Sequence, residues 1–168
     1  TESKEYYSNF RIKRLGLDGI IDILFSPEDH DIPEDVIKQT AYSPDLTLNN
    51  HTPEGEVKPN PRILRDIIHQ ANADIEDCVY IGDSEMKDIA MAQSTGVSDV
   101  YAKYGTSHFE DNVEGYELLR KVTHWSDEDV AREKAIKSES VNLNISPSYT
   151  AEKFSDILGY FNFEKFRK

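Results

Sequence analysis

The middle of the chain alternates between helical and strand patterns, and this alternation limits the fold more than any other feature of the sequence. Apolar residues recur at helical spacing from Pro61 to Ala71, an apolar run follows from Cys78 to Ile81, and helical spacing returns over residues 85–95. Gly96 closes that helix, and Val97 to Ala102 is a second apolar run. Helices and strands of these lengths predict parallel strands with right-handed crossovers. We therefore expect an α/β fold with a doubly wound parallel sheet.

The flanking segments are less regular. A helix is expected at residues 3–15 and a strand at residues 20–25, and weaker helical patterns cover residues 116–122, 126–136 and 150–160. Residues 26–56 contain four prolines and keep no period, so we interpret them as an insertion with one short helix at residues 34–40.

Composition excludes some classes of function. A net charge of −13 and a pI near 4.7 argue against nucleic acid as a partner, although a small phosphorylated molecule can bind if a cation offsets the field. No apolar run is long enough to span a membrane, and no secretory signal opens the chain. The single cysteine, Cys78, predicts a buried thiol in a cytoplasmic protein. Because the first residue is Thr1 rather than Met, we expect the chain to begin partway through a longer product or after processing.

Two carboxylates follow the apolar run that ends at Gly82. Asp83 stands at the carboxyl end of the expected strand, where open α/β sheets bind ligands, and Asp88 lies five residues further on, in the first turns of the next helix. Converging carboxylates suit a hard cation such as Mg²⁺. The same Asp83-Ser84-Glu85 run also suits an ordinary helix cap, so the local sequence leaves both interpretations open.

Lys58 adds a positive charge to the same region. It precedes the helix that leads into the strand ending at Asp83, so both residues should lie at one edge of the sheet. A lysine there can offset phosphate charge or hold a carboxylate nucleophile in place.

Together these segments resemble the third and fourth motifs of the haloacid-dehalogenase-like (HAD) superfamily. The matching residues are Lys58-Pro59-Asn60-Pro61, then Gly82-Asp83-Ser84 with Asp88, then Thr95-Gly96-Val97. The resemblance covers residues 1–104 and implies a HAD-like Rossmannoid core, incomplete at its N-terminus, with the activity of a Mg²⁺-dependent phosphohydrolase. By the same resemblance, residues 1–125 are the C-terminal part of that core, with the insertion at 26–56, and residues 126–168 are a helical extension that packs on it.

The resemblance also implies roles for individual residues. Lys58 would steady a phosphoaspartyl intermediate, and Asp83 and Asp88 would hold Mg²⁺. Thr1 matches the motif-two hydroxyl that contacts the transferring phosphoryl group. We expect Ser84 and Asn60, which adjoin these motifs, to contact the substrate, a small phosphorylated metabolite.

The chain departs from the family at the first motif, the Asp-x-Asp that supplies the nucleophile. No Asp-x-Asp follows an apolar strand here, and Asp29-His30-Asp31 lies inside the insertion, after the motif-two position. The expected nucleophile therefore lies upstream, and this chain alone is expected to be inactive. Its expected partners are that missing segment or a second copy of the chain.

Three alternatives compete with the phosphohydrolase. A non-catalytic HAD-like binding module would explain the missing first motif. A HAD enzyme of other chemistry, a dehalogenase or a phosphonatase, is disfavoured by the intact pair Asp83 and Asp88, because dehalogenases need no Mg²⁺. A two-component receiver domain is excluded because its lysine follows its acids, whereas Lys58 precedes Asp83.

Overall fold

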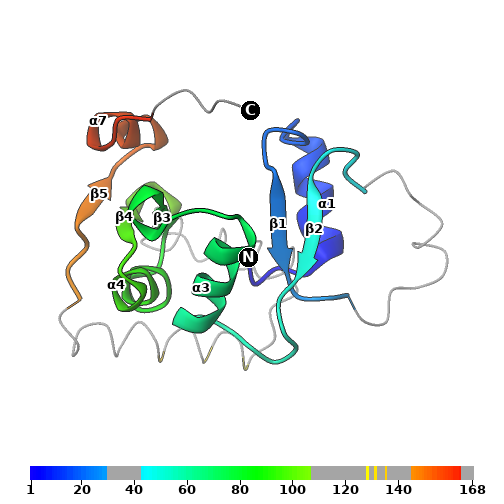
Figure 1. Cartoon of the computed structure of the whole chain (residues 1–168), viewed down its shortest axis with the longest axis horizontal. Helices are drawn as coiled ribbons and strands as arrows, with labels where there is room; N and C mark the ends of the chain where they lie inside the picture. The colour runs from blue at the N-terminus through cyan, green and yellow to red at the C-terminus, as the bar shows by residue number, and fades with distance from the viewer. Residues whose placement is uncertain (30–42, 107–127, 129–130, 132–134, 136–144, 164–168) are drawn as a thin grey trace. The chain divides into compact units, whose positions relative to one another are not determined.

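The computed structural model of the chain consists of two compact units, residues 1–57 and 58–168 (Figure 1). It describes residues 1–29, 43–106, 128, 131, 135 and 145–163. The helices expected at 34–40 and 116–122, and most of the one expected at 126–136, lie outside these residues; residues 128, 131 and 135 are helical and exposed. The division at residue 125 stays a prediction. Among the described helices, none is both long and apolar enough to cross a bilayer.

The first unit is a helix and two parallel strands. Helix α1 (Glu5–Arg14) lies within the segment expected to be helical, and β1 (Ile23–Ser26) overlaps the expected strand. Strand β2 (Leu48–His51) pairs with β1 in parallel, with Ile23 opposite Leu48. No strand was predicted there, because three of its four residues are polar.

Polar side chains hold this unit together where an apolar core is thin. The Glu5 carboxylate in α1 accepts a hydrogen bond from Asn49 Nδ2 at 2.8 Å and lies 2.6 Å from His51 Nε2, both in β2. The hydrogen bond between Glu5 and His51 raises the pKa of His51 above its ordinary value. The Asp18 carboxylate accepts backbone hydrogen bonds from Asp45, Leu46 and Thr47, so it fixes the segment that leads into β2.

The second unit contains a three-stranded parallel sheet. Its strands are β3 (Val79–Gly82), β4 (Ser98–Ala102) and β5 (Tyr149–Ala151), in that order across the sheet. Both pairings are parallel, with Val79 opposite Ser98 and Val100 opposite Tyr149. The expected α/β class and parallel pairing are confirmed.

Helices cover both faces of this sheet. On one face, α3 (Pro61–Gln70) and α4 (Ala90–Thr95) enclose a core of Leu64, Ile68, Met91 and Val97, against which Cys78 and Tyr80 of the β3 region pack. On the other, α7 (Ile157–Tyr160) packs Ile157 against Val100 and Ala151. Because successive residues of a strand point to opposite faces, Tyr80 faces α3 and Val79 faces α7. This arrangement gives Tyr80 its place near the site described below.

Two expected helices differ from the structure. The helix at 85–95 begins as a π-helical turn, η3 (Glu85–Ile89), before it continues as α4. The helix at 150–160 is wrong over its first residues: Thr150 and Ala151 lie in β5, a 3₁₀ turn η6 (Phe154–Asp156) follows, and only α7 is α-helical. The pairing of β5 with β4 joins residues distant in sequence, which local periodicity does not report.

Candidate functional site

Lys58 lies at the start of the second unit, just before a well-capped helix. The Asn60 side chain accepts hydrogen bonds from the backbone N–H groups of Arg62 and Ile63, at 3.2 and 3.3 Å, and Pro61 occupies the first turn of α3. The Lys58–Pro59 peptide bond is cis. The helix start is therefore fixed by the sequence itself, and the chain just ahead of it carries Lys58 toward β3.

Lys58, Tyr80 and Asp88 form the main polar cluster of this unit, called here the Lys58 cluster. Lys58 Nζ lies 2.7 Å from Asp88 Oδ1, and the Tyr80 hydroxyl donates to the same oxygen at 3.0 Å. Lys58 Nζ also lies 5.5 Å from the centre of the Tyr80 ring. The Asp88 side chain is 6% exposed and that of Lys58 is 28% exposed. A shielded ion pair of this kind interacts more strongly than one on the surface.

Glycine at position 82 makes room for this cluster. A Cβ atom added to Gly82 would overlap the Asp88 side chain. The backbone at Ser84 completes the arrangement, because its N–H donates to Asp88 Oδ2 at 3.2 Å. The Ser84 hydroxyl accepts from Lys87 N at 3.2 Å and so caps the turn that carries Asp88. The Gly-Asp-Ser run thus brings Asp88 back against the end of β3.

The surroundings of the Lys58 cluster fix its charges. Burial alone would lower the pKa of Lys58, but Tyr80 and Asp88 raise it above its ordinary value, so the ammonium is charged at neutral pH. Burial raises the pKa of Tyr80 to about 12, despite the opposing effect of Lys58. Tyr80 is therefore a neutral hydrogen-bond donor in the physiological range.

Asp83 has a different environment from Asp88. Its side chain is exposed, and within the described part of the chain no hydrogen bond to it is found. Gly105 of the 3₁₀ turn η4 (Lys103–Gly105) lies against it, since an added Cβ there would come within 2.8 Å of Asp83 Cβ. The pKa of Tyr104 in the same turn is raised by burial and by the charge of Asp83.

The carboxylates of Asp83 and Asp88 fit a Mg²⁺ site in part. The exposed Asp83 carboxylate suits a hard cation, which commonly takes one or two carboxylates and completes its shell with water. Asp88 already bonds through both oxygens, to Lys58, Tyr80 and Ser84. Among the described residues, no group of three or more His, Cys, Asp or Glu side chains could enclose a metal ion.

The structure thus brings together part of the expected site. Lys58 and Asp88 are in direct contact, and Ser84 and Asp83 adjoin them. Asn60 is placed as a helix cap, and its role toward substrate stays a prediction. Thr1 belongs to the first unit, where Ser3 N donates to its hydroxyl, and its motif-two role also stays a prediction.

Sequence reasoning missed Tyr80. Its position two residues before Gly82 places it on the same strand face, and that spacing could have signalled a contact with Asp88. Cys78, expected to be buried, is half-buried; its thiol donates to Asp74 O at 3.2 Å, and burial raises its pKa.

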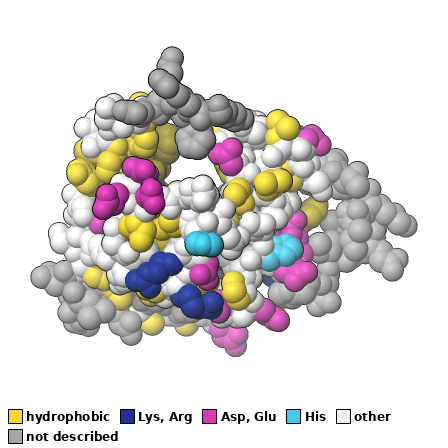
Figure 2. All heavy atoms as spheres, viewed as in Figure 1, with side chains coloured by type: hydrophobic (Ala, Val, Ile, Leu, Met, Phe, Trp, Pro, Cys, Tyr) yellow, Lys and Arg dark blue, Asp and Glu magenta, His cyan; other side chains and the backbone are white. Residues whose placement is uncertain are grey.

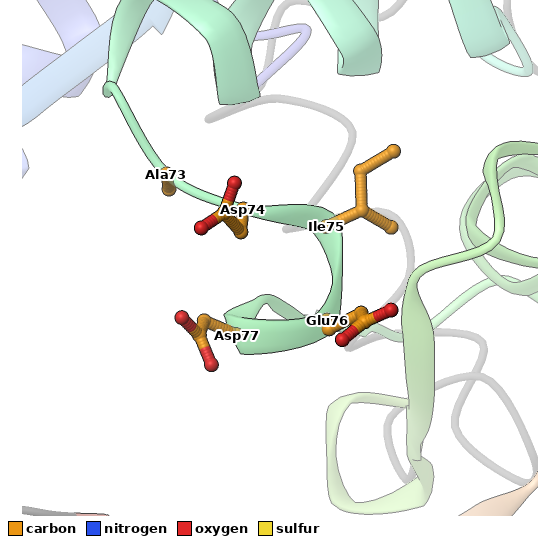
Figure 3. A pocket seen from close by; sticks show the side chains of 5 residues that line it. All are labelled: Ala73, Asp74, Ile75, Glu76 and Asp77. Atoms are coloured by element: carbon orange, nitrogen blue, oxygen red, sulfur yellow. The ribbon is translucent and has the colours of Figure 1, made fainter.

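Other polar features of the surface are less organised. A shallow hollow at the amino end of β3 is lined by residues 73–77, including Asp74, Glu76 and Asp77 (Figure 3). These residues come from the turn η2 (Ile75–Asp77) and its approach, at the opposite end of the strand from Gly82. On the face shown in Figure 2, acidic side chains occur at several places and the basic ones form a small group.

Comparison with known proteins gives one family. Residues 57–123 match the family described as HAD-hydrolase-like, and this segment includes Lys58, Asp83 and Asp88. The expected resemblance is thereby confirmed for this segment. No curated protein matches the chain significantly.

Three solved structures are similar to the chain at low identity. A 2-haloacid dehalogenase from Pseudomonas syringae pv. Tomato DC3000 is 18% identical, with 67% of this chain and 51% of that one covered and a TM-score of 0.34. A HAD-superfamily hydrolase of subfamily IA from Geobacter sulfurreducens PCA is 21% identical, with coverages of 56% and 45% and a TM-score of 0.32. A p-nitrophenyl phosphatase from Archaeoglobus fulgidus is 17% identical, with coverages of 94% and 52% and a TM-score of 0.37. The chain spans about half the length of these structures.

Proposed function

We propose that this chain, whose residues 57–123 are HAD-hydrolase-like, is the phosphate-binding part of a Mg²⁺-dependent phosphomonoesterase. The observation that carries the proposal is the Lys58–Asp88 contact of 2.7 Å at the carboxyl end of β3, the strand that Asp83 follows with an exposed side chain. A chain with a net charge of −13 needs a local cation to hold an anionic substrate. Lys58 is the cation we propose, because its ammonium is held at the carboxyl end of β3 by Asp88.

In the proposed reaction, an aspartate upstream of this chain attacks the phosphorus atom of a phosphomonoester. The bond from phosphorus to the ester oxygen breaks, the leaving alkoxide takes a proton from the second carboxylic acid of the upstream Asp-x-Asp motif, and an aspartyl phosphate forms. Water then attacks the phosphorus atom, which releases phosphate and regenerates the carboxylate. Lys58 lies where its charge would offset that of the phosphoryl oxygens, and Asp88 and Tyr80 keep it oriented.

Asp83 and Asp88 are the residues proposed to hold Mg²⁺, and the Asp83 side chain is the exposed one of the two. When bound, the ion would offset negative charge on the phosphoryl group. Ser84, whose backbone N–H donates to Asp88, would contact the substrate. We propose a small phosphorylated metabolite as substrate and a cytoplasmic location, in line with the free thiol of Cys78.

The test is release of p-nitrophenol from its phosphate ester by the chain joined to its upstream segment. Turnover should require Mg²⁺ and should fall by about 10²–10³-fold in Lys58→Met, as when one transition-state donor is removed. Asp83→Asn should abolish turnover, and added Mg²⁺ should not restore it. Lys153→Met is the matched control, because this lysine is 74% exposed and should leave the rate unchanged.

The 168-residue chain assayed by itself should be inactive, since it lacks the proposed nucleophile. Turnover by this chain alone would contradict an upstream nucleophile. Absence of turnover in the joined protein, over a range of metals and pH, would instead favour a non-catalytic binding module.

A further inference from the structure

We propose that Tyr80 is a positioning residue for Lys58. The Tyr80 hydroxyl fixes the Asp88 oxygen that holds the Lys58 ammonium, and the Tyr80 ring limits the space on one side of that ammonium. The catalytic consequence rests on the proposed function, but the positioning itself can be measured without it. The inference starts from strand geometry. Tyr80 and Gly82 are two residues apart in β3, so they face the same side, where Asp88 approaches Gly82 closely.

The hydrogen bonds of Asp88 show how the restraint works. Oδ1 accepts from both Lys58 Nζ, at 2.7 Å, and the Tyr80 hydroxyl, at 3.0 Å, while Oδ2 accepts from Ser84 N at 3.2 Å. With donors on both oxygens, the carboxylate cannot rotate about its last bond without losing a contact. The oxygen that Lys58 uses is therefore held in one place.

Lysine needs such a restraint more than arginine does. Its ammonium is a compact charge on a flexible four-carbon stem, without the planar fork that fixes a guanidinium. The ring of Tyr80, 5.5 Å from Lys58 Nζ, limits the space on one side of that charge. A displacement of about 1 Å at a reacting centre can cost roughly 10²-fold in rate, so a small restraint is consequential.

The alternative is that Tyr80 is only a core aromatic. It does pack against the core of Leu64, Ile68, Met91 and Val97. A phenylalanine would serve that purpose equally well and would have no hydroxyl to place. Substitution by phenylalanine therefore separates the two roles, because it keeps the ring and removes the donor to Asp88.

The test follows the Lys58 ammonium by NMR in protein labelled with ¹⁵N-lysine, with the signal assigned by its loss in Lys58→Arg. In Tyr80→Phe the signal should shift, and its exchange with water should accelerate several-fold, while the amide spectrum stays that of a folded protein. Tyr101→Phe is the control: Tyr101 lies opposite Gly82 in the sheet, and its hydroxyl makes no hydrogen bond in the described part of the chain. An unchanged Lys58 signal in Tyr80→Phe would overturn the proposal.

A measurement on the unaltered protein guards against loss of folding in the variant. The Tyr80 hydroxyl proton should exchange slowly enough to be observed, with a nuclear Overhauser effect to the Lys58 side chain; a freely exchanging hydroxyl would also overturn the proposal. In the phosphatase assay, Tyr80→Phe should lower kcat by about three- to tenfold, the effect of one hydrogen bond, and leave KM unchanged. An equal kcat would refute the catalytic consequence. If the unaltered joined protein shows no turnover, the proposed function fails, whereas the NMR result still decides the positioning.

Discussion

At the scale of single residues, Asp83 and Asp88 are alike in the sequence and opposite in the structure. Asp83 is exposed, whereas Asp88 is 94% shielded and bonded through both oxygens. Only four residues lie between them, and the π-helical turn that includes Asp88 gives the two carboxylates different environments. A substitution of the exposed Asp83 is therefore a matched control for the same substitution of the buried Asp88.

Replacement of Asp88 by asparagine should destabilise the protein by about 2–3 kcal/mol. The Lys58 ammonium would face a neutral amide, and the new NH₂ group would meet a donor in either orientation: Lys58 Nζ at the Oδ1 position or the Ser84 N–H at the Oδ2 position. Urea unfolding measures the loss. Asp83→Asn, at an exposed position, should change stability by less than about 0.5 kcal/mol. Equal losses in the two variants would contradict the assigned burial.

At the scale of elements, the turn after β3 depends on how closely the backbone of one strand approaches the next helix. Gly82→Ala should destabilise the second unit by about 1–3 kcal/mol, because its methyl group would overlap Asp88. It should also disturb the Lys58 signal. Gly159→Ala in α7 is the control, since nothing lies within 4 Å of an added Cβ there and alanine favours a helix by up to about 1 kcal/mol. Thermal unfolding of both variants would show whether the loss is specific to position 82.

The hydrogen bonds between Asp18, which lies between α1 and β1, and residues 45–47 predict a pH dependence of stability. Backbone hydrogen bonds lower the pKa of Asp18 from 3.8 to about 2. Because the folded-state pKa lies below the unfolded value, the stabilisation is present above about pH 3.8 and is lost as the pH falls toward 2. Asp18→Asn should therefore make the stability of the first unit less dependent on pH within this window, as measured by urea unfolding at a series of pH values.

Asp22→Asn is the matched control for Asp18, because Asp22 lies four residues away and is exposed. Its substitution should leave the acid dependence as it is in the unaltered protein. If the stability of Asp18→Asn depended on pH as strongly as that of the unaltered protein, the backbone donors of residues 45–47 would not hold the Asp18 carboxylate.

At the scale of the whole molecule, the net charge of −13 governs which anions can bind. We expect no binding of a fluorescent DNA duplex at 0.15 M salt in an anisotropy titration covering the micromolar range, where non-specific DNA-binding proteins have Kd values of roughly 10⁻⁴–10⁻⁶ M. Addition of poly-aspartate at equal concentration should leave the anisotropy of the duplex unchanged. Salt-sensitive binding of the duplex would contradict the expectation.

The sequence by itself determined the local features of the second unit. Apolar runs and helical spacing located β3, β4 and α3, and Pro61 and Gly96 marked where helices begin or end. These features follow from neighbours in the chain, whose side-chain periodicity and capping chemistry act over a few residues. The placing of Lys58 and Asp83 at one edge of the sheet was expected from the same reasoning, because it required only the order of the elements. The direct contact of Lys58 with Asp88 came from the structure.

Tertiary structure alone decided the rest. The pairings of β5 with β4 and of β2 with β1 join segments far apart in the sequence, and three of the four residues of β2 are polar. The contact of Tyr80 with Asp88, and the exposure of Asp83, depend on how the turn after Gly82 folds back on the strand. Such contacts join residues through space, and their energies come from burial and from shared hydrogen-bond partners, which a one-dimensional pattern does not contain.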